Sequence, residues 1–326
     1  MERYKAVIIG LGRIGQDFDY DQRDDSIVAT HASAYFYHPG FELLAGVDPV
    51  PSQRERFEIK FKRPAYSDIK TMTDLHRPDV VSIAVPVNQH FTIFQEIIHC
   101  KPKAIICEKP IAPSLAESRL MQSIADDHQC ALLVNYMRRF DPGSMALKRI
   151  IHQGAVGEIF KGVVWYGKGL LNNGTHFIDL LCYWLGDVSA VEIMEKGRQW
   201  DGKDPEPDIC LHFGKAVVYV LAGRAEYYST GEIDLFGSKG RIRYTESGKR
   251  IAIYKTVSDP VFKDYTILGQ EVEVIPTGLE RYQWHVLDGL YNHLAHHTAL
   301  ASDGYTASKT MEVFELACSD IKKEVQ

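Results

Sequence analysis

A glycine-rich turn that follows a short apolar run is the feature that most constrains the fold of this chain. Residues 5–9 read KAVII, a strand-like segment, and residues 10–15 read GLGRIG, with G-x-G-x-x-G spacing. In such a turn the glycines permit a tight bend, a close approach of a pyrophosphate, and close packing of a helix on the strand. The pattern predicts a helix from about Arg13, with a dinucleotide phosphate at its first amides. The expected cofactor-binding residues here are Gly10, Gly12, Arg13, Ile14 and Gly15.

The next strand-like run, residues 41–47, ends on an acidic residue. Asp48 follows it directly, and no Lys or Arg comes after Asp48 until Arg54. A carboxylate at this point accepts hydrogen bonds from the adenosine ribose and repels a 2′-phosphate. Its distance from the glycine turn exceeds the usual spacing of about 20 residues, because the polar stretch 16–26 intervenes. We therefore expect Asp48 to bind the cofactor and to favour NAD over NADP.

The first part of the chain alternates strand-like and helix-like segments, which is typical of a parallel sheet. Ser114 and Glu117 form a capping box at the start of one of the helices. A length of 326 residues with 45% apolar content gives material for two domains, the first an NAD(P)-binding domain at 1–136. Its expected strands are 5–9, 42–47, 79–85, 103–107 and 131–136, and its later helices are 52–60, 89–99 and 115–128.

From residue 137 onward, a linking helix that begins at Asp141-Pro142 leads into strand-like segments joined by turns such as GSKG at 237–240. The expected strands are 158–167, 188–197, 208–222, 231–236, 241–245, 250–255 and 266–275, and the expected helices are 281–297 and 306–323. The predicted fold class is α/β: an N-terminal Rossmann dinucleotide-binding domain, and a C-terminal α/β domain at 137–326 built on a mostly antiparallel open sheet.

Composition excludes several classes of function. A net charge of −6 offers no broad basic surface for nucleic acid. No uninterrupted apolar segment approaches the roughly 20 residues that span a bilayer, and the N-terminus lacks a signal-peptide pattern. The six cysteines form no C-x-x-C pair and are typical of reduced core residues. We expect a cytoplasmic protein that binds neither nucleic acid nor membrane.

No metal site is predicted. The thirteen histidines give no H-E-x-x-H motif and no Cys/His cluster. The stretch from Gln16 to Thr30 is rich in aspartate and superficially resembles a calcium loop. Counted from Asp19, it lacks the glycine at the sixth position and the closing glutamate. We interpret it as a solvated loop, and a role as a lid or a dimer contact stays open.

Two places carry side chains suited to chemistry. The apolar run 104–107 reads as a buried strand and ends on Glu108 and Lys109, and ligands in doubly wound folds bind outside the carboxyl ends of such strands. A plain surface ion pair is the alternative. Further along, His176 and Asp179 share one face of a helix start. That histidine could shuttle a proton or simply brace the helix.

Taken in order, the motifs of this chain resemble those of the Gfo/Idh/MocA family, the group of glucose-fructose oxidoreductase, inositol dehydrogenase and the rhizopine-catabolism protein. The resemblance spans nearly the whole chain and rests on GLGRIG at 10–15, AVPVNQH at 84–90, EKP at 108–110, NYMRRFDP at 135–142, GTHFID at 174–179 and GSKG at 237–240. It implies a Rossmann domain and an α/β domain whose open sheet serves oligomer contacts and carries one wall of the substrate pocket. We expect a homodimer or homotetramer.

The resemblance also implies roles for individual residues. Lys109 would hydrogen-bond the reacting hydroxyl or carbonyl, and His176 would accept a proton during alcohol oxidation. Further cofactor-binding residues would be Val85, Pro86, Asn88, His90 and Glu108. The substrate would contact Lys109, Arg139, Tyr166, Lys168, Asn172, Asn173 and His176.

One departure from the family pattern concerns Asn172, since many members have aspartate four residues before the motif histidine. An amide cannot stabilise an imidazolium by charge. Three alternatives stay open: His176 is a weaker base than in those members, Asp179 substitutes in part, or Lys109 does more of the proton transfer. The expected function is an NAD-dependent oxidoreductase. It would move a hydride between nicotinamide and a secondary alcohol or ketone of a sugar, cyclitol or nucleotide sugar, the last in cell-surface glycan biosynthesis. The alternative is a catalytically inactive, NAD- and sugar-binding regulatory protein of the same fold.

Overall fold

The computed structural model describes residues 3–319. Within these residues the chain divides into two compact units. The first unit comprises the residues up to Phe140 together with Glu280–Ser308, and the second comprises Asp141–Leu279 together with the residues from Lys309 onward. The first unit thus receives a late segment of the chain, and one boundary falls inside helix α9 (Gly304–Ala317). No helix of the described residues is both long and apolar enough to cross a bilayer.

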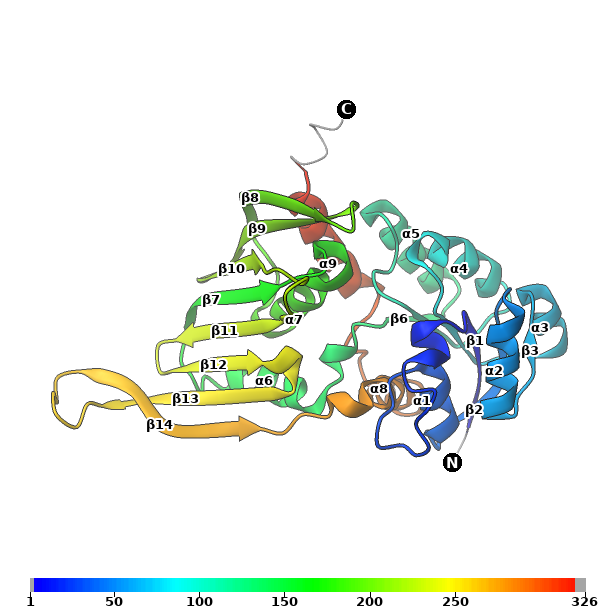
Figure 1. Cartoon of the computed structure of the whole chain (residues 1–326), viewed down its shortest axis with the longest axis horizontal. Coiled ribbons are helices and arrows are strands. Elements are labelled where there is room, and N and C mark those ends of the chain that lie inside the picture. Colours follow the sequence, from blue (N-terminus) through cyan, green and yellow to red (C-terminus); the bar gives the residue numbers. More distant parts are fainter. Residues whose placement is uncertain (1–2, 320–326) are drawn as a thin grey trace. The chain divides into compact units, whose positions relative to one another are not determined.

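The first unit is built on a six-stranded parallel sheet in the order β3-β2-β1-β4-β5-β6, which confirms the predicted Rossmann-type architecture (Figure 1). Its central strands are buried along their whole length, as expected for a sheet covered on both faces. The strands are β1 (Tyr4–Ile9), β2 (Phe41–Val47), β3 (Ala65–Tyr66), β4 (Val80–Ile83), β5 (Ala104–Cys107) and β6 (Ala131–Val134).

The helices predicted at 52–60, 89–99 and 115–128 are present in the first unit. The structure adds three short elements that the sequence pattern did not predict: β3, a helix at 31–37 and a helix at 69–75. Ser114 caps α5 as expected, since its side chain accepts a hydrogen bond from the Glu117 N–H. The helices are α1 (His31–Tyr37), α2 (Pro51–Phe61), α3 (Ile69–Leu75), α4 (His90–Ile98), α5 (Leu115–Asp127) and α8 (Tyr282–His296), with short turns η2 (Val87–Gln89), η3 (Met137–Arg139) and η6 (Leu279–Arg281) at the unit's loops and edge.

The helix predicted from Arg13 is only a five-residue π-helical turn, η1 (Arg13–Asp17). It ends there because Asp19 holds the following loop in a different path. The Asp19 carboxylate is buried and accepts hydrogen bonds from the Ala29 N–H at 2.7 Å, the Thr30 hydroxyl at 2.7 Å and the Ser33 hydroxyl at 2.8 Å. The acidic stretch is therefore not simply solvated. One of its aspartates fixes the start of α1, and with it the place of His31.

The second unit carries an eight-stranded sheet in the order β14-β13-β12-β11-β7-β10-β9-β8. All neighbours are antiparallel except β7 and β10, which confirms the predicted mostly antiparallel sheet (Figure 1). The strands are β7 (Ile159–Tyr166), β8 (Ala190–Trp200), β9 (Asp204–Phe213), β10 (Ala216–Ala222), β11 (Glu232–Gly237), β12 (Gly240–Thr245), β13 (Arg250–Ser258) and β14 (Thr266–Ile275).

One face of this sheet packs against helices of the same unit. These are α6 (Pro142–His152), which Asp141 caps through the Ser144 N–H, and α7 (Thr175–Leu185). Trp184 of α7 packs edge-on against Tyr244 of β12 with ring centroids 5.7 Å apart. On the opposite face of the sheet, Phe160 and Trp165 of β7 are exposed. The expected use of that face in oligomer contacts stays a prediction.

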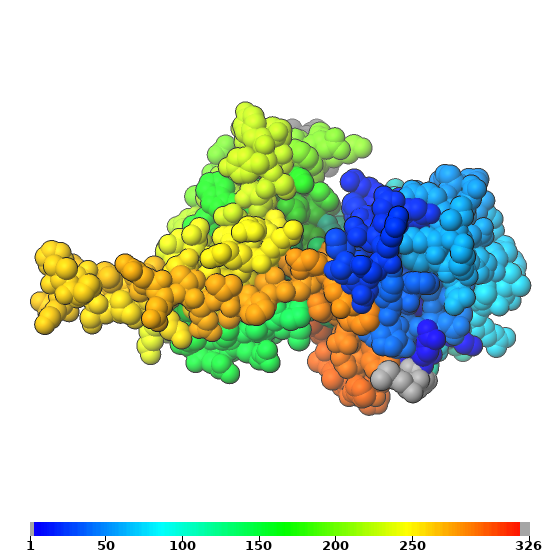
Figure 2. Space-filling model, turned by 60° about the horizontal axis from the view of Figure 1, so that its bottom comes forward, coloured from blue at the N-terminus to red at the C-terminus, as the bar shows by residue number. Residues whose placement is uncertain are grey.

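Two details of the second unit differ from the sequence prediction. The segment expected as one strand at 208–222 is two strands, because a turn at Gly214, with φ +54°, separates β9 from β10. The hairpin of β13 and β14 is longer than expected and extends well beyond the rest of its sheet (Figure 2, yellow and orange). The helix predicted at 306–323 appears as α9, and the last residues of that prediction lie outside the described part of the chain.

Candidate functional site

A cavity of about 500 Å³ lies at the carboxyl ends of β1, β2 and β4 in the first unit. This edge of a parallel sheet is where doubly wound folds bind ligands. Several residues predicted to bind a cofactor line the cavity, while others, such as Ser67 and Asp68 before α3, were not anticipated. The predicted residues among the lining are Gly10, Gly12, Asp48, Val85 and Pro86.

The three motif glycines have the properties that a dinucleotide requires. Gly10 has φ +97°, and a Cβ there would lie 2.5 Å from the Ala84 carbonyl oxygen. A Cβ on Gly15 would lie 2.2 Å from the Gly10 carbonyl oxygen, so the turn closes only with glycine. A Cβ on Gly12 would meet no atom within 4 Å. The backbone at Gly12 is therefore open on the side where a pyrophosphate would approach. The site fits NAD, and a diphosphate at Gly12 stays a prediction.

Asp48 follows β2 and has a structural task in addition to the predicted one. Its Oδ2 accepts a hydrogen bond from the Leu11 N–H, and its Oδ1 accepts one from the Val50 N–H, each at 2.8 Å. The carboxylate thus ties the glycine turn to the end of β2. Each carboxylate oxygen has a second lone pair, so Asp48 can still accept a ribose hydroxyl from the cavity.

Of the remaining residues expected near the cofactor, Arg13 is exposed, with its guanidinium 5.1 Å from the centre of the Phe18 ring, and Ile14 is half-buried. Asn88 is exposed on the short turn η2. His90 is buried, with Nε2 2.9 Å from the Val85 carbonyl and Nδ1 3.0 Å from the Pro110 carbonyl. The ring of His90 thus braces the loops after β4 and β5, and its contact with the cofactor stays a prediction.

Lys109 follows the carboxyl end of β5, which neighbours β4 in the sheet. The Glu108 N–H donates to the Ile83 carbonyl at 3.0 Å and so continues the pairing of the two strands by one residue. Lys109 therefore lies one strand away from Val85 and Pro86 of the cavity lining. The Lys109–Pro110 peptide bond is cis.

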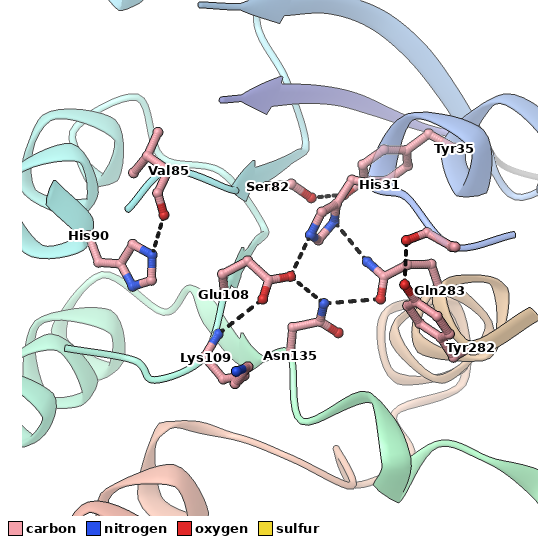
Figure 3. A network of polar contacts seen from close by, with 11 residues as sticks. His31, Tyr35, Ser82, Val85, His90, Glu108, Lys109, Asn135, Tyr282 and Gln283 are labelled. Atoms are coloured by element: carbon pink, nitrogen blue, oxygen red, sulfur yellow. Dashed lines mark hydrogen bonds and ion pairs between the residues drawn. The ribbon is translucent and has the colours of Figure 1, made fainter. Parts of the chain in front are cut away.

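Glu108 is held within a network of polar side chains (Figure 3). Its Oε1 lies 3.0 Å from His31 Nε2 and 2.5 Å from Asn135 Nδ2, and its Oε2 accepts the Lys109 N–H at 3.3 Å. Burial disfavours the charged carboxylate, but the hydrogen bonds from His31 and Asn135 and the charge of Lys109 outweigh burial, so the pKa of Glu108 lies below its ordinary value. The contact of Glu108 with the cofactor stays a prediction.

Arg139, predicted as a substrate contact, lies on η3 within the first unit. It is only 3% exposed, and its Nη1 donates to the Ala301 carbonyl at 3.1 Å. This bond gives the guanidinium a structural task. A contact of Arg139 with the substrate stays a prediction.

In the second unit, His176 lies in the first turn of α7 and is mostly buried. Asp179, one turn later, is also buried and accepts a hydrogen bond from the Thr310 hydroxyl at 3.2 Å. The predicted sharing of one helix face is thus consistent with their spacing on α7. The catalytic role of His176 stays a prediction.

The loop that leads into α7, residues 167–174, is held by two carboxylates of β9. Asp204 accepts the Leu171 N–H at 2.9 Å and the Asn172 N–H at 2.8 Å, and Glu206 accepts the Gly169 N–H at 3.0 Å. The side chain of Asn172 donates to the Lys168 carbonyl, and that of Asn173 donates to the Gly167 carbonyl. Asn172 and Lys168 are exposed on this loop. An aspartate is therefore present at this loop after all, from β9 rather than from position 172.

Tyr166, at the end of β7, was predicted to contact a substrate. It is 0% exposed, and its hydroxyl donates to the Pro207 carbonyl at 2.7 Å. Burial, together with the charge of Glu206, raises the pKa of this phenol well above its usual range. The hydroxyl thus joins the end of β7 to β9, and a contact of Tyr166 with the substrate stays a prediction.

One group of potential metal ligands exists among the described residues. Glu192 of β8 and Cys210 and His212 of β9 have ligand atoms within 4.8 Å of one another. His212 Nε2 lies 2.9 Å from Glu192 Oε1, a hydrogen bond that accounts for their proximity. Burial raises the pKa of the Cys210 thiol, and so does the charge of Glu192, which disfavours the thiolate that binds metals. We assign no metal to these three residues.

Comparison with known proteins identifies the first unit. Residues 4–136 match the family GFO_IDH_MocA, described as an oxidoreductase family with an NAD-binding Rossmann fold. Residues 4–136 thus belong to the Gfo/Idh/MocA oxidoreductase family. The matched segment contains the glycine turn, the residues that line the cavity, and Lys109.

Relatives and solved structures extend the similarity to the rest of the chain. The chain is 25% identical to inositol 2-dehydrogenase of Rhizobium meliloti (strain 1021) over 72% of its length and 73% of that protein. It is 31% identical to levoglucosan dehydrogenase of Pseudarthrobacter phenanthrenivorans over 53% of its length and 54% of that protein. The fold is similar to that of levoglucosan dehydrogenase in complex with NADH and levoglucosan, with a TM-score of 0.82, 19% identity, and coverage of 99% of this chain and 98% of that one.

The sequence pattern did not indicate the network of His31, Asn135 and Gln283 around Glu108. It also did not indicate the role of Asp204 and Glu206 on β9. His31 and Gln283 are 252 positions apart and meet only because α8 returns to the first unit. Asp204 and Glu206 lie on a strand whose start was predicted four residues too late. A search for polar residues with no place in an amphipathic pattern could have marked Gln283, but its partner could not be read from spacing.

Proposed function

We propose that this protein uses NAD to interconvert a secondary alcohol and a ketone on a sugar, cyclitol or nucleotide sugar. The observation that carries the proposal is the place of Lys109. It follows β5 at the carboxyl edge of the sheet, one strand from the part of the cavity lined by Val85 and Pro86. The dehydrogenases of inositol and levoglucosan among the relatives act on polyhydroxylated rings, which supports the same substrate class here.

In this proposal the first unit supplies binding, orientation and one proton-handling group. Gly10, Gly12 and Gly15 hold the diphosphate, and Pro86 borders the nicotinamide. When bound, NAD supplies the hydride acceptor or donor. Lys109 donates a hydrogen bond to the substrate oxygen, which polarises a ketone and stabilises the oxygen of an alcohol as its proton leaves.

The second unit contributes His176 in the proposal, as the group that accepts the hydroxyl proton. A neutral imidazole accepts a proton in the physiological pH range. Because position 172 is Asn, the negative charge closest in sequence is that of Asp179 on the same helix. Lys168 and Asn173, on the loop before α7, are the remaining candidates for contacts with substrate hydroxyls.

The cofactor preference is part of the proposal. Asp48 lines the cavity, and a second carboxylate, Asp68 at the start of α3, lines it too. Hydrogen bonds from Thr71 and Ser67 hold the pKa of Asp68 below its ordinary value, so this group is charged. Two negative charges would repel a 2′-phosphate, which supports NAD over NADP.

A panel assay tests the proposal. The protein is offered sugars, cyclitols and nucleotide sugars with NAD and, in parallel, with NADP, and the absorbance of newly reduced nicotinamide is followed. We expect turnover with at least one member, and with NAD in preference to NADP. Calorimetry with NAD alone serves as the control. NAD binding without turnover on any alcohol, or on the corresponding ketones with NADH, would contradict the proposed activity and favour a regulatory protein.

A further inference from the structure

The network behind Lys109 contains three buried side chains to which the proposed function gives no task. His31 and Gln283 are each 1% exposed, and Asn135 is 2% exposed. They come from the start of α1, the end of β6 and the first turn of α8. His31 and Asn135 contact Glu108, and Gln283 contacts both of them (Figure 3). Burying polar groups is costly unless each finds a partner. An arrangement assembled from three distant segments therefore calls for an explanation.

The carboxylate of Glu108 sets the direction of every hydrogen bond in the network, because it can only accept. Asn135 Nδ2 lies 2.5 Å from Glu108 Oε1 and 3.0 Å from Gln283 Oε1. The reverse orientation of the Asn135 amide would place its oxygen against two other oxygens, so Asn135 donates to both. Gln283 thus accepts with its oxygen and turns its Nε2 towards His31 Nδ1, at 3.2 Å.

This pattern assigns the tautomer of His31. Since Gln283 donates to Nδ1, the neutral ring carries its proton on Nε2, which lies 3.0 Å from Glu108 Oε1. A proton on Nδ1 would face the N–H of Gln283. Two donors, from His31 and Asn135, therefore converge on one oxygen of Glu108, while the other oxygen accepts the Lys109 N–H.

We infer that His31 is a positioning residue for Lys109 and acts through Glu108. Its Nε2–H holds Glu108 as a carboxylate in one rotamer, so that a fixed negative charge stands beside the lysine. The buried Asp19 contributes indirectly, because its bonds to Thr30 and Ser33 fix the start of α1, where His31 lies. The inference rests on the proposed function, since it takes Lys109 as the group that acts on the substrate.

Other titratable groups face Glu108 and belong in the account. Tyr282 of α8 is buried and donates to the Ala29 carbonyl, and burial raises the pKa of its phenol, as does the charge of Glu108. Cys107 of β5 is buried, and its thiol pKa is raised by burial and by Glu108. Both groups stay neutral around Glu108 at physiological pH. Among its titratable neighbours, His31 and Lys109 are thus the two that favour the charged form of Glu108.

The first test follows Glu108 itself in the full-length protein by carbon NMR of labelled glutamate carboxyls, with the signal assigned through E108Q. In H31F the donor is lost, and we expect the titration midpoint of Glu108 to rise. H31Q can place an amide N–H where Nε2 was and should restore the midpoint in part. H38F removes a second buried histidine, at the other end of α1, and should leave the midpoint unchanged. An unchanged midpoint in H31F would overturn the inference.

The second test follows catalysis with the substrate found in the panel. We expect kcat to fall about 10- to 100-fold in H31F, the size of effect that misplacement of a catalytic group produces. The acid limb of the pH profile of kcat/KM should move to higher pH, as the titration midpoint of Glu108 does. H31Q should recover part of the rate, and H38F should match wild type. Wild-type kcat and an unchanged acid limb in H31F would overturn the inference.

A third measurement needs neither activity nor a variant that folds. Nitrogen NMR of labelled histidine in the wild-type protein should show His31 with its proton on Nε2 and a bare Nδ1. A proton on Nδ1 would overturn the assigned network. If the panel finds no substrate, the proposed function fails, while the NMR measurements still decide whether His31 controls Glu108.

Discussion

The segment behind Lys109 and the segment before His176 are both held by carboxylates, but in different ways. Behind Lys109, the side chains of His31 and Asn135 donate to one oxygen of Glu108, and the Lys109 N–H donates to the other. Before His176, backbone N–H groups of the loop donate to Asp204 and Glu206, and the Arg198 side chain also donates to Glu206. The first arrangement fixes the charge of Glu108 next to Lys109. The second fixes the path of the loop.

The two arrangements also differ in their exposure to water. Glu108 lies in a network whose members are nearly all buried, so its bonds act in a medium of low polarity. Glu206 is equally buried, but its partner Arg198 extends to Glu226 at the surface, where Arg198 lowers the pKa of Glu226 to about 2. Mutations behind Lys109 should therefore affect global stability and charge, whereas mutations under the loop should act locally.

The largest effect is expected for Glu108→Leu. This change leaves the N–H groups of His31 and Asn135 buried without an acceptor. Each buried donor left unsatisfied costs about 1–3 kcal/mol, so we expect the free energy of unfolding to fall by about 2–6 kcal/mol. Urea unfolding followed by circular dichroism measures the effect. D187A, which removes an exposed partner of Lys309, is the control and should cost no more than about 1 kcal/mol. Equal losses of unfolding free energy in the Glu108→Leu variant and in D187A would contradict the expected difference between a buried and an exposed carboxylate.

The pH dependence of stability gives a second, smaller effect. The folded-state pKa of Glu108 lies below the ordinary value of 4.5, so its ionisation stabilises the fold above that pH, and the gain is lost as the pH falls through the folded-state pKa. The difference in unfolding free energy between wild type and E108Q should thus be larger at about pH 7 than at about pH 3. A difference that grows on acidification would contradict the sign of this argument.

A third prediction concerns the loop before His176. In D204A the N–H groups of Leu171 and Asn172 lose their acceptor, at an expected cost of about 1–2 kcal/mol. Hydrogen exchange should accelerate at these two amides and much less in β7 or β12. A uniform increase in exchange across the second unit would show that Asp204 supports the whole sheet rather than the loop.

The smallest effect is expected for Tyr166→Phe. It removes one hydrogen bond, to the Pro207 carbonyl, and should cost about 1 kcal/mol of stability. Because the hydroxyl is buried and committed to that carbonyl, we expect no change in KM for the substrate found in the panel. A several-fold rise in KM with unchanged stability would indicate that the Tyr166 hydroxyl contacts the substrate.

The sequence was sufficient for the architecture, because the spacing of apolar runs determines a parallel sheet, and for the glycine turn, because only glycine closes it. It was not sufficient for the side chains that meet across long separations. Gln283 reaches Asn135 from 148 positions away, and nothing in the local pattern of either residue signals the contact. Sequence alone did not show the burial of Tyr166, Arg139 and His90 either.

The prediction of a helix from Arg13 was wrong for a related reason. The motif predicts a helix by local spacing, but the bonds of Asp19 to Thr30 and Ser33 redirect the chain after Asp17. The aspartates between residues 17 and 25 predicted a solvated loop. Only the hydrogen-bond partners of Asp19 distinguish this buried residue from the other aspartates.

The most direct test of the account compares two lysines at opposite ends of β5. Lys109 follows the strand, and Lys103, which pairs with Asp79, precedes it. Turnover and NAD affinity are measured for K109M and K103M with the substrate found in the panel. The account predicts that K109M binds NAD nearly as wild type while turnover falls about 10²- to 10⁴-fold, and that K103M keeps both. Undiminished turnover in K109M, or an equal loss in K103M, would contradict the central place given to Lys109.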